Sequence, residues 1–395
     1  MGQLPRHGHR PDDGWRRTGS RRRVPQDPWH RERLRLQQRR LPERQLLQSD
    51  THGDRSCASP RRPSLRGGNP LRQVGFPGRP GGTTAIGYGS SGLHGGWSRR
   101  ESLALLETAF DAGIRHFDTA PPYGLGEAEA LVGELVARHR GEVTVTSKFG
   151  LPPPRARAAM DVARGILRPL VARFPRAKAR LVEAAGAVAQ VGRPPKSTAY
   201  SVPAMLASLE ASLRKLRCDR IDLFLVHEGG VEALGDDLRA ALEAQVSKGA
   251  IGAWGIGSPR RLVDGVVDAG AGLPPVLQFE WSVCSDRRPD YSGSFVITQG
   301  AIRGALPRLG ESMKQEARRR AWSERLGIDA GDPASLASVL LGAAAAVNPG
   351  GIVLFSSKRK GHVRELARVG PPEEEKGRLL LSMLAEEPSG LPRER

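Results

Sequence analysis

Residues 221–228 read Ile-Asp-Leu-Phe-Leu-Val-His-Glu, an almost continuous apolar run that ends in two polar residues. Such a run is typical of a strand that is buried on both faces of a parallel sheet. The segment before it, residues 202–216, has the apolar spacing of an amphipathic helix. Because this helix-then-strand unit recurs in both directions along the chain, the stretch indicates an α/β protein.

Strand-like and helix-like segments alternate from about residue 83 to residue 357. We expect eight strands, at residues 83–91, 115–120, 143–150, 221–228, 250–258, 276–282, 294–300 and 351–357. We expect helices at residues 101–110, 127–138, 202–216, 233–248, 260–269 and 333–346, the first of them opened by a capping box of Ser98 and Glu101. Eight such units predict a (β/α)8 TIM barrel rather than an open doubly wound sheet.

The net charge of +19 over 395 residues is concentrated in two segments. Residues 1–75 contain 18 Arg and 7 acidic residues, and residues 151–200 contain 10 basic and 2 acidic residues, which together account for the whole excess. We therefore predict a basic, low-complexity and disordered tail at residues 1–75 and a barrel at residues 76–370. The barrel carries a basic insertion at about residues 151–200, and residues 371–395 form a C-terminal helix and tail.

The basic tail could in principle be a nucleic-acid-binding arm. Its only aromatic residues are Trp15 and Trp29, without a stacking pattern, so we favour a tail without conserved chemistry or a start codon assigned too far upstream. The longest apolar stretch, Leu336 to Val347, is too short to span a bilayer.

The three cysteines are Cys57, Cys218 and Cys284. They are far apart and have no second ligand at metal-binding spacing, which argues against disulfides and against a metal site. We expect a reducing, cytoplasmic setting.

A glycine pattern, Gly87-x-Gly89-x-x-Gly92, follows the first strand and matches the Rossmann dinucleotide fingerprint. No helix opens directly on the last glycine, and no strand with an acidic end follows at the expected distance. We interpret the segment as a glycine-rich loop after the first barrel strand, one that still allows a cofactor to approach the backbone.

Polar residues stand at the ends of consecutive strands, where a barrel gathers its active site. Asp118 ends the second strand, Tyr123 follows it, Lys148 lies near the end of the third and His227 ends the fourth. Each alone has a structural explanation, as a helix cap, a packed aromatic, a surface charge or a core histidine. Together they indicate a catalytic group, because a buried Lys beside a Tyr needs a carboxylate to keep it charged.

Four segments of the chain resemble the signature segments of the aldo-keto reductases in order and spacing. They are FDTAPPYGLGEAE (117–129), VTVTSKFG (143–150), SLRKLRCDRIDLFLVHE (212–228) and KGAIGAWGIGS (248–258). The resemblance covers about residues 76–370 and implies a catalytic tetrad of Asp118, Tyr123, Lys148 and His227. It implies an oxidoreductase that uses NADP(H) without a Rossmann domain, with a small carbonyl compound or sugar as substrate.

The chemistry of these residue types agrees with carbonyl reduction. The reaction needs a hydride on carbon and a proton on oxygen, and Tyr123 can give the proton if the Lys148 ammonium lowers its pKa. Asp118 would keep Lys148 charged, and His227 would polarise the carbonyl.

The resemblance also implies cofactor contacts. Ser258 and Gln278 match positions that bind the nicotinamide amide, and Ser357, Lys358 and Arg364 match the adenosine-phosphate segment. Two positions depart from the family: Pro259 replaces the usual Asn, and the aromatic that stacks on the nicotinamide is replaced near Thr298.

Two further departures concern the loops. The connection between Ser282 and Ser294 is too short for the usual sixth helix, and residues 156–174 in the basic insertion have the spacing of an amphipathic helix. This helix would cover the active site, pack on the barrel flank or lie on a membrane surface. The alternative to an enzyme is a nucleotide-sensing regulatory barrel with little catalytic activity.

Overall fold

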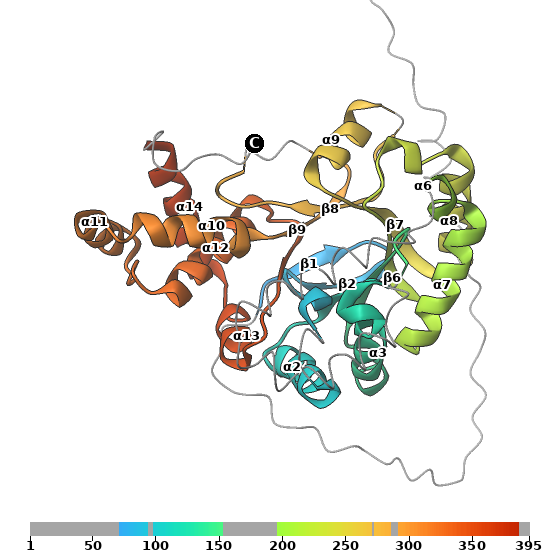
Figure 1. Ribbon diagram of the computed structural model, residues 1–395, viewed down its shortest axis with the longest axis horizontal. Coiled ribbons are helices and arrows are strands. Elements are labelled where there is room, and N and C mark those ends of the chain that lie inside the picture. The colour runs from blue at the N-terminus through green and yellow to red at the C-terminus, as the bar shows by residue number, and fades with distance from the viewer. Residues whose placement is uncertain (1–70, 94–97, 153–195, 271, 286–290, 387–395) are drawn as a thin grey trace, which may run out of the picture. The chain divides into compact units, whose positions relative to one another are not determined.

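Eight parallel strands close into a barrel in the computed structural model, which describes residues 71–93, 98–152, 196–270, 272–285 and 291–386 (Figure 1). The order around the barrel is β10-β3-β4-β5-β6-β7-β8-β9. The strands are β3 (Ile86–Gly89), β4 (His116–Asp118), β5 (Thr144–Phe149), β6 (Ile221–His227), β7 (Ile251–Gly257), β8 (Val276–Glu280), β9 (Phe295–Gln299) and β10 (Ile352–Phe355). The predicted (β/α)8 barrel is confirmed.

A β-hairpin that the sequence did not predict precedes the barrel. It consists of β1 (Gln73–Phe76) and β2 (Arg79–Thr84), so the segment expected as one strand from residue 83 is broken at Ala85. The glycines and prolines of this region have the composition of a loop, which concealed the hairpin.

The hairpin packs against the N-terminal end of the barrel. The ring of Phe76 lies 5.6 Å from the rings of His116 and Phe295, and it joins the apolar cluster inside the barrel. The turn residue Gly78 has φ +70°, and a Cβ there would lie 2.3 Å from the carbonyl oxygen of Gly252. Only glycine therefore fits where the turn meets the barrel.

The predicted helices are present and surround the barrel. They are α2 (Arg99–Asp111), α3 (Ala128–Arg138), α7 (Val202–Leu216), α8 (Asp236–Ser247), α9 (Arg260–Asp268) and α12 (Pro333–Val347). The capping box that opens α2 is confirmed: the Ser98 hydroxyl accepts a hydrogen bond from the Glu101 amide, and the Glu101 carboxylate accepts one from the Ser98 amide at 2.8 Å.

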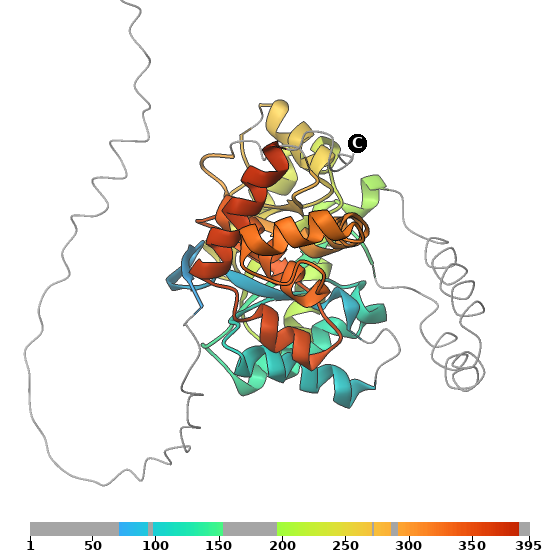
Figure 2. The same cartoon turned by 90° about the vertical axis from the view of Figure 1, so that its left-hand side faces the viewer.

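Other helical segments are additional to those six. They are η1 (Ser90–Gly92), η2 (Tyr123–Gly126), α6 (Lys196–Ala199), η3 (Val231–Ala233), α10 (Ala301–Ser312), α11 (Glu316–Leu326), α13 (Lys360–Leu366) and α14 (Pro371–Glu386). Figure 1 shows α10, α11, α12 and α14 on the side of the barrel opposite α7 and α8, and Figure 2 looks onto that side. There they enclose a second apolar cluster that includes Trp322, Leu340 and Met383.

The helices α12 and α14 cross at very short distance. A Cβ at Gly342 would lie 2.1 Å from the carbonyl oxygen of Glu373, and a Cβ at Gly377 would lie 2.3 Å from the amide nitrogen of Ala343. The two glycines therefore permit an approach that larger residues would prevent.

The connection between β8 and β9 contains no helix in its described residues, as the sequence predicted. The buried residue Tyr291 packs there instead, with its ring 5.2 Å from that of Phe279 and its hydroxyl donating to Asp264 of α9. The amphipathic helix predicted at residues 156–174 lies outside the described residues, and so do residues 1–70 of the predicted tail at residues 1–75. The last residues of that predicted tail instead form the start of β1. Within the described ranges, no helix combines the length and hydropathy needed to cross a membrane.

Candidate active site

Side chains alternate along each strand, and those at the carboxyl ends that face the barrel interior form one polar layer. Asp118, Lys148, His227, Gln278 and Gln299 occupy such positions on β4, β5, β6, β8 and β9. The first three are adjacent because β4, β5 and β6 are neighbouring strands. The fold thus brings together the strand-end residues that the sequence singled out.

A buried ion pair forms the centre of this layer. The Lys148 ammonium lies 2.8 Å and 2.7 Å from the two carboxylate oxygens of Asp118, and it also donates to the carbonyl oxygen of Thr119 at 3.1 Å. Both charged side chains are about 97% buried. Burial lowers the pKa of Lys148, but the negative charge of Asp118 opposes it strongly enough to raise the pKa overall. Lys148 is therefore a fixed cation within the barrel.

Tyr123 lies over this cation, in the loop after β4. The Lys148 nitrogen is 5.0 Å from the centroid of the Tyr123 ring, so the positive charge of Lys148 acts directly on the phenol. The ring of His227 lies 5.6 Å away at an interplanar angle of 85°. A phenol, an ammonium and an imidazole therefore meet at one point of the barrel mouth.

The backbone after Tyr123 explains how the phenol is held there. Gly124 and Leu125 both have left-handed conformations, with φ of 56° and 59°. Glycine adopts this conformation without cost, whereas Leu125 is strained. Two consecutive left-handed residues turn the chain sharply between Tyr123 and α3. Strain of this kind persists only where the surrounding structure enforces it.

The direction in which the pKa of Tyr123 is shifted differs from the sequence expectation. Burial raises its pKa above the usual value of 10, and the opposing charge of Lys148 does not cancel the rise, to which Asp118 and Glu228 also contribute. The charge of Lys148 does lower the pKa of Tyr123, as expected, but burial raises that pKa by more, so the net shift is upward. Tyr123 is protonated at neutral pH, as a proton donor must be.

His116 is a second histidine inside the barrel, and it is not suited to donate a proton. Burial, followed by the charge of Lys148, lowers its pKa to about 3. Its two ring nitrogens lie 3.0 Å and 3.3 Å from the hydroxyls of Thr144 and Thr146. It is a neutral hydrogen-bonding residue of the barrel core.

The predicted nicotinamide contacts adjoin the ion pair. The Gln278 amide donates to Asp118 and to Gln299, both at 3.1 Å, and its Oε1 has no hydrogen-bond partner among the described residues. Ser258 donates through its hydroxyl to the Gly229 carbonyl at 2.7 Å, and its amide donates to the Gln278 carbonyl. Ser258 and Gln278 therefore lie side by side at the ends of β7 and β8.

Within the segment near Thr298, the structure shows which residue faces the barrel interior. Ile297 belongs to the cluster inside the barrel and Gln299 is bonded to Gln278, so the alternation directs Thr298 away from the interior. The interior residue at the end of β9 is therefore Gln299. It had no motif to reveal it, because its role depends on the register of the strand.

The predicted phosphate-binding residues form a separate group after β10. The Ser357 carbonyl accepts a hydrogen bond from the Tyr88 hydroxyl at 2.9 Å, and the Ser357 hydroxyl accepts one from the Arg359 amide at 3.2 Å. Lys358 lies beside the end of η1, since a Cβ on Gly92 would be 3.7 Å from its Cε. Arg364 is exposed on α13. The glycine-rich loop and this basic segment are therefore neighbours.

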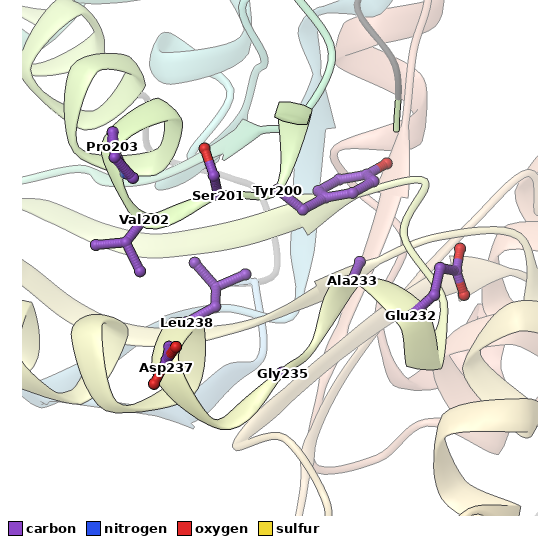
Figure 3. A pocket seen from close by; sticks show the side chains of 9 residues that line it. All are labelled: Tyr200, Ser201, Val202, Pro203, Glu232, Ala233, Gly235, Asp237 and Leu238. Atoms are coloured by element: carbon purple, nitrogen blue, oxygen red, sulfur yellow. The ribbon is translucent and has the colours of Figure 1, made fainter. Parts of the chain in front are cut away.

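Two residues near the tetrad were not predicted. Glu228 follows His227 with a left-handed φ of 57° and acts electrostatically on Tyr123. Tyr200 donates from its hydroxyl to the His227 carbonyl at 2.8 Å. Tyr200 also lines a pocket of about 530 Å³ between the starts of α7 and α8 (Figure 3). Tyr200 lies outside the four signature segments, and Glu228 ends one of them, but its left-handed conformation becomes visible only in the backbone.

Comparison with known proteins gives one family. The aldo/keto reductase family model matches residues 85–292. A D-threo-aldose 1-dehydrogenase of a Pseudomonas species is 32% identical over 185 residues, which is 44% of this chain and 50% of the relative. This chain thus spans about half the length of that relative.

Solved structures share the fold. An aldo-keto reductase from Bacillus halodurans in its holo form superposes with a TM-score of 0.57 at 18% identity, over 80% of this chain and 96% of that one. One from Klebsiella pneumoniae in complex with NADPH gives 0.51 at 20% identity, over 82% and 96%. Since the family model covers more than half of the chain, this protein belongs to the aldo/keto reductase family.

Proposed function

We propose that this protein is an NADP(H)-dependent oxidoreductase that interconverts an aldehyde, ketone or sugar hemiacetal with the alcohol or lactone. The observation that carries the proposal is the contact between Tyr123 and Lys148, whose ammonium is itself held by both oxygens of Asp118. A phenol beside a buried, permanently charged ammonium is suited to releasing and recovering a proton. Family membership supports the same activity.

Tyr123 acts as the general acid in reduction and as the general base in oxidation. Its raised pKa keeps it protonated at neutral pH, ready to donate to a developing alkoxide. When the proton leaves, the Lys148 ammonium at 5.0 Å from the ring stabilises the phenolate. Asp118 holds Lys148 in place and charged.

His227 directs the carbonyl. Its imidazole faces the Tyr123 ring edge to face, so a carbonyl oxygen between the two groups can accept hydrogen bonds from both. Two donors on one oxygen fix the orientation of the carbonyl plane and hence the face that is reduced.

The residues at the ends of β7 and β8 fit a nicotinamide. The two N–H groups of Gln278 are already donated to Asp118 and Gln299, so its remaining Oε1 can accept a hydrogen bond from a carboxamide. Ser258 lies next to it. A nicotinamide bound there would supply the hydride for the carbonyl carbon.

Ser357, Lys358 and Arg364 are proposed to bind the extra phosphate of NADP(H). Lys358 and Arg364 provide positive charge near the glycine-rich loop, and charged donors of this kind suit a phosphate group. The solved relative from Klebsiella pneumoniae in complex with NADPH, which has the same fold, supports this choice of cofactor.

The substrate class follows the names of the relatives. One is a D-threo-aldose 1-dehydrogenase and another a pyridoxal 4-dehydrogenase. We infer a small aldehyde or sugar hemiacetal as the substrate. We also infer a cytoplasmic location, because the three cysteines are far apart in the sequence and do not suggest a disulfide framework.

The test begins with cofactor binding. Titration with NADPH and with NADH, followed by Trp fluorescence, should give tighter binding of NADPH. Turnover is then measured with pentoses and hexoses as hemiacetals and with benzaldehyde and pyridoxal as aldehydes.

Tyr123→Phe is the decisive variant. It should abolish turnover, by a factor of about 10² or more, and leave NADPH binding nearly unchanged. Turnover close to that of the wild type would contradict the role of Tyr123. Binding without turnover in the wild type would instead favour a nucleotide-sensing barrel.

A further inference from the structure

Tyr200 connects two of the strands that carry the tetrad. It is 8% exposed and lies just before α7. Its hydroxyl donates a 2.8 Å hydrogen bond to the backbone carbonyl of His227, the last residue of β6. Its ring lies against Gly150, which follows the end of β5, two residues after Lys148.

Two glycines make room for the ring. A Cβ on Gly150, which has φ +106°, would lie 2.2 Å from a ring carbon of Tyr200. A Cβ on Gly229 would lie 3.5 Å from the same carbon. Tyr200 therefore occupies the space that side chains on the two strand-end loops would fill, and it holds the loops in a fixed relation.

The other flank of Tyr200 borders the pocket. Val202 and Leu238 line the same pocket of about 530 Å³, and Figure 3 shows the phenol extending from the start of α7 toward the loop that carries Ala233. The hydroxyl bond to His227 adds a directional polar contact to the packing of this buried ring.

The chain turns sharply at the carbonyl that Tyr200 contacts. Glu228 has a φ of 57°, and its amide donates to the Gly257 carbonyl at 3.0 Å. The carbonyl of His227 immediately precedes this strained residue. A hydrogen bond there stabilises the conformation that directs the His227 imidazole toward Tyr123.

We propose that Tyr200 is a positioning residue of the active site, which acts through the backbone of His227 to set the imidazole against Tyr123. The inference rests on the proposed function, because it assigns Tyr200 to the same reaction. We expect the rate to be affected more than cofactor binding, because the Tyr200 hydroxyl binds the His227 carbonyl and its ring lies against Gly150, two residues after Lys148.

The variant Tyr200→Phe tests the proposal because it keeps the ring and removes only the hydroxyl. With the best substrate of the panel and saturating NADPH, kcat per NADPH-binding site should fall about tenfold to 100-fold, while KM and the NADPH Kd stay within about twofold. Tyr291→Phe is the matched control, because it removes another buried hydroxyl, bonded to Asp264 on the barrel flank, and should leave kcat unchanged.

An equal loss of kcat in both variants, or an unchanged kcat in Tyr200→Phe, would overturn the proposal. A second measurement does not depend on turnover. The ¹⁵N resonances of the His227 imidazole, assigned by comparison with His227→Gln, should shift in Tyr200→Phe and stay in place in Tyr291→Phe. If the wild type proves inactive on the panel while this shift is found, the proposed function fails and the positioning role stands. If the His227 resonances do not shift in Tyr200→Phe, the positioning role of Tyr200 is refuted.

Discussion

The buried pair of Lys148 and Asp118 predicts an unusual dependence of stability on pH in the variant Asp118→Asn. The wild-type carboxylate accepts from Lys148 through both oxygens and from Gln278 through one of them. Asparagine offers one acceptor oxygen and adds an NH₂ group that faces these donors. The Lys148 charge therefore stays buried without its counterion.

The loss in the free energy of unfolding of Asp118→Asn has an upper limit. Breaking one partner of a buried ion pair costs about 3–5 kcal/mol. The electrostatic contribution to this cost cannot exceed the free energy of deprotonating Lys148, because the neutral amine does not pay the cost of burying an unpaired charge. From its ordinary pKa of 10.5 to pH 7, at about 1.4 kcal/mol per unit, this limit is about 5 kcal/mol. At pH 9.5 it is only about 1.4 kcal/mol.

The sign follows from proton binding. In the variant, the pKa of Lys148 is lowered in the folded state, so the unfolded state binds more protons and stability rises with pH toward 10.5. In the wild type, the pKa of Lys148 is raised, and its contribution is lost only as the pH rises beyond 10.5. We therefore expect Asp118→Asn to lose about 3–5 kcal/mol at pH 7 and clearly less at pH 9.5.

Guanidinium unfolding at the two pH values, followed by circular dichroism, measures both numbers. Glu129→Gln is the matched control. Glu129 is equally buried, but its partner Lys215 is 33% exposed and can turn toward water. The control should lose stability without pH-dependent recovery. A cost for Asp118→Asn that is the same at both pH values, or below about 1 kcal/mol at pH 7, would refute the reasoning.

Two further predictions concern the proton donor and the cofactor. Glu228→Gln removes a negative charge that raises the pKa of Tyr123, so the alkaline limb of kcat/KM for reduction should move to lower pH by a few tenths of a unit, as measured by a pH profile; a shift to higher pH would contradict the assignment. Lys358→Ala combined with Arg364→Ala should weaken NADPH binding by about 10- to 100-fold and leave NADH binding unchanged, as measured by Trp fluorescence; equal losses for both cofactors would exclude a role at the extra phosphate.

The sequence predicted the parts of the molecule that depend on local pattern. Apolar periodicity determines the eight barrel strands, and two residues three apart determine the capping box of α2. The small number of residues before β9 determines the shortened connection there. The strand-end residues Asp118, Lys148 and His227 could be predicted to meet because their strands are consecutive in a barrel.

The features that the sequence missed depend on spatial arrangement. The hairpin of β1 and β2 is rich in Gly and Pro and finds its partners only on the assembled barrel. The net pKa direction of Tyr123 depends on how deeply the phenol is buried, which no motif encodes. Gln299 faces the barrel interior because of the pairing register of β9, and a shift of that register by one residue would turn Gln299 outward.

Gln278 illustrates what only barrel closure can provide. In the strand order, β8 lies four positions from β4, so the two strands face each other across the barrel. The Gln278 side chain crosses that interior to reach a carboxylate 160 residues away in sequence, the same one that holds Lys148. Its amide nitrogen also donates to Gln299, which leaves Oε1 as a buried acceptor without a partner among the described residues. A ligand that binds this oxygen is therefore connected to Lys148 through only two residues, Gln278 and Asp118. We expect cofactor binding and the protonation of Tyr123 to be coupled through Asp118, since any shift of the Gln278 amide changes the hydrogen bonds that hold the carboxylate.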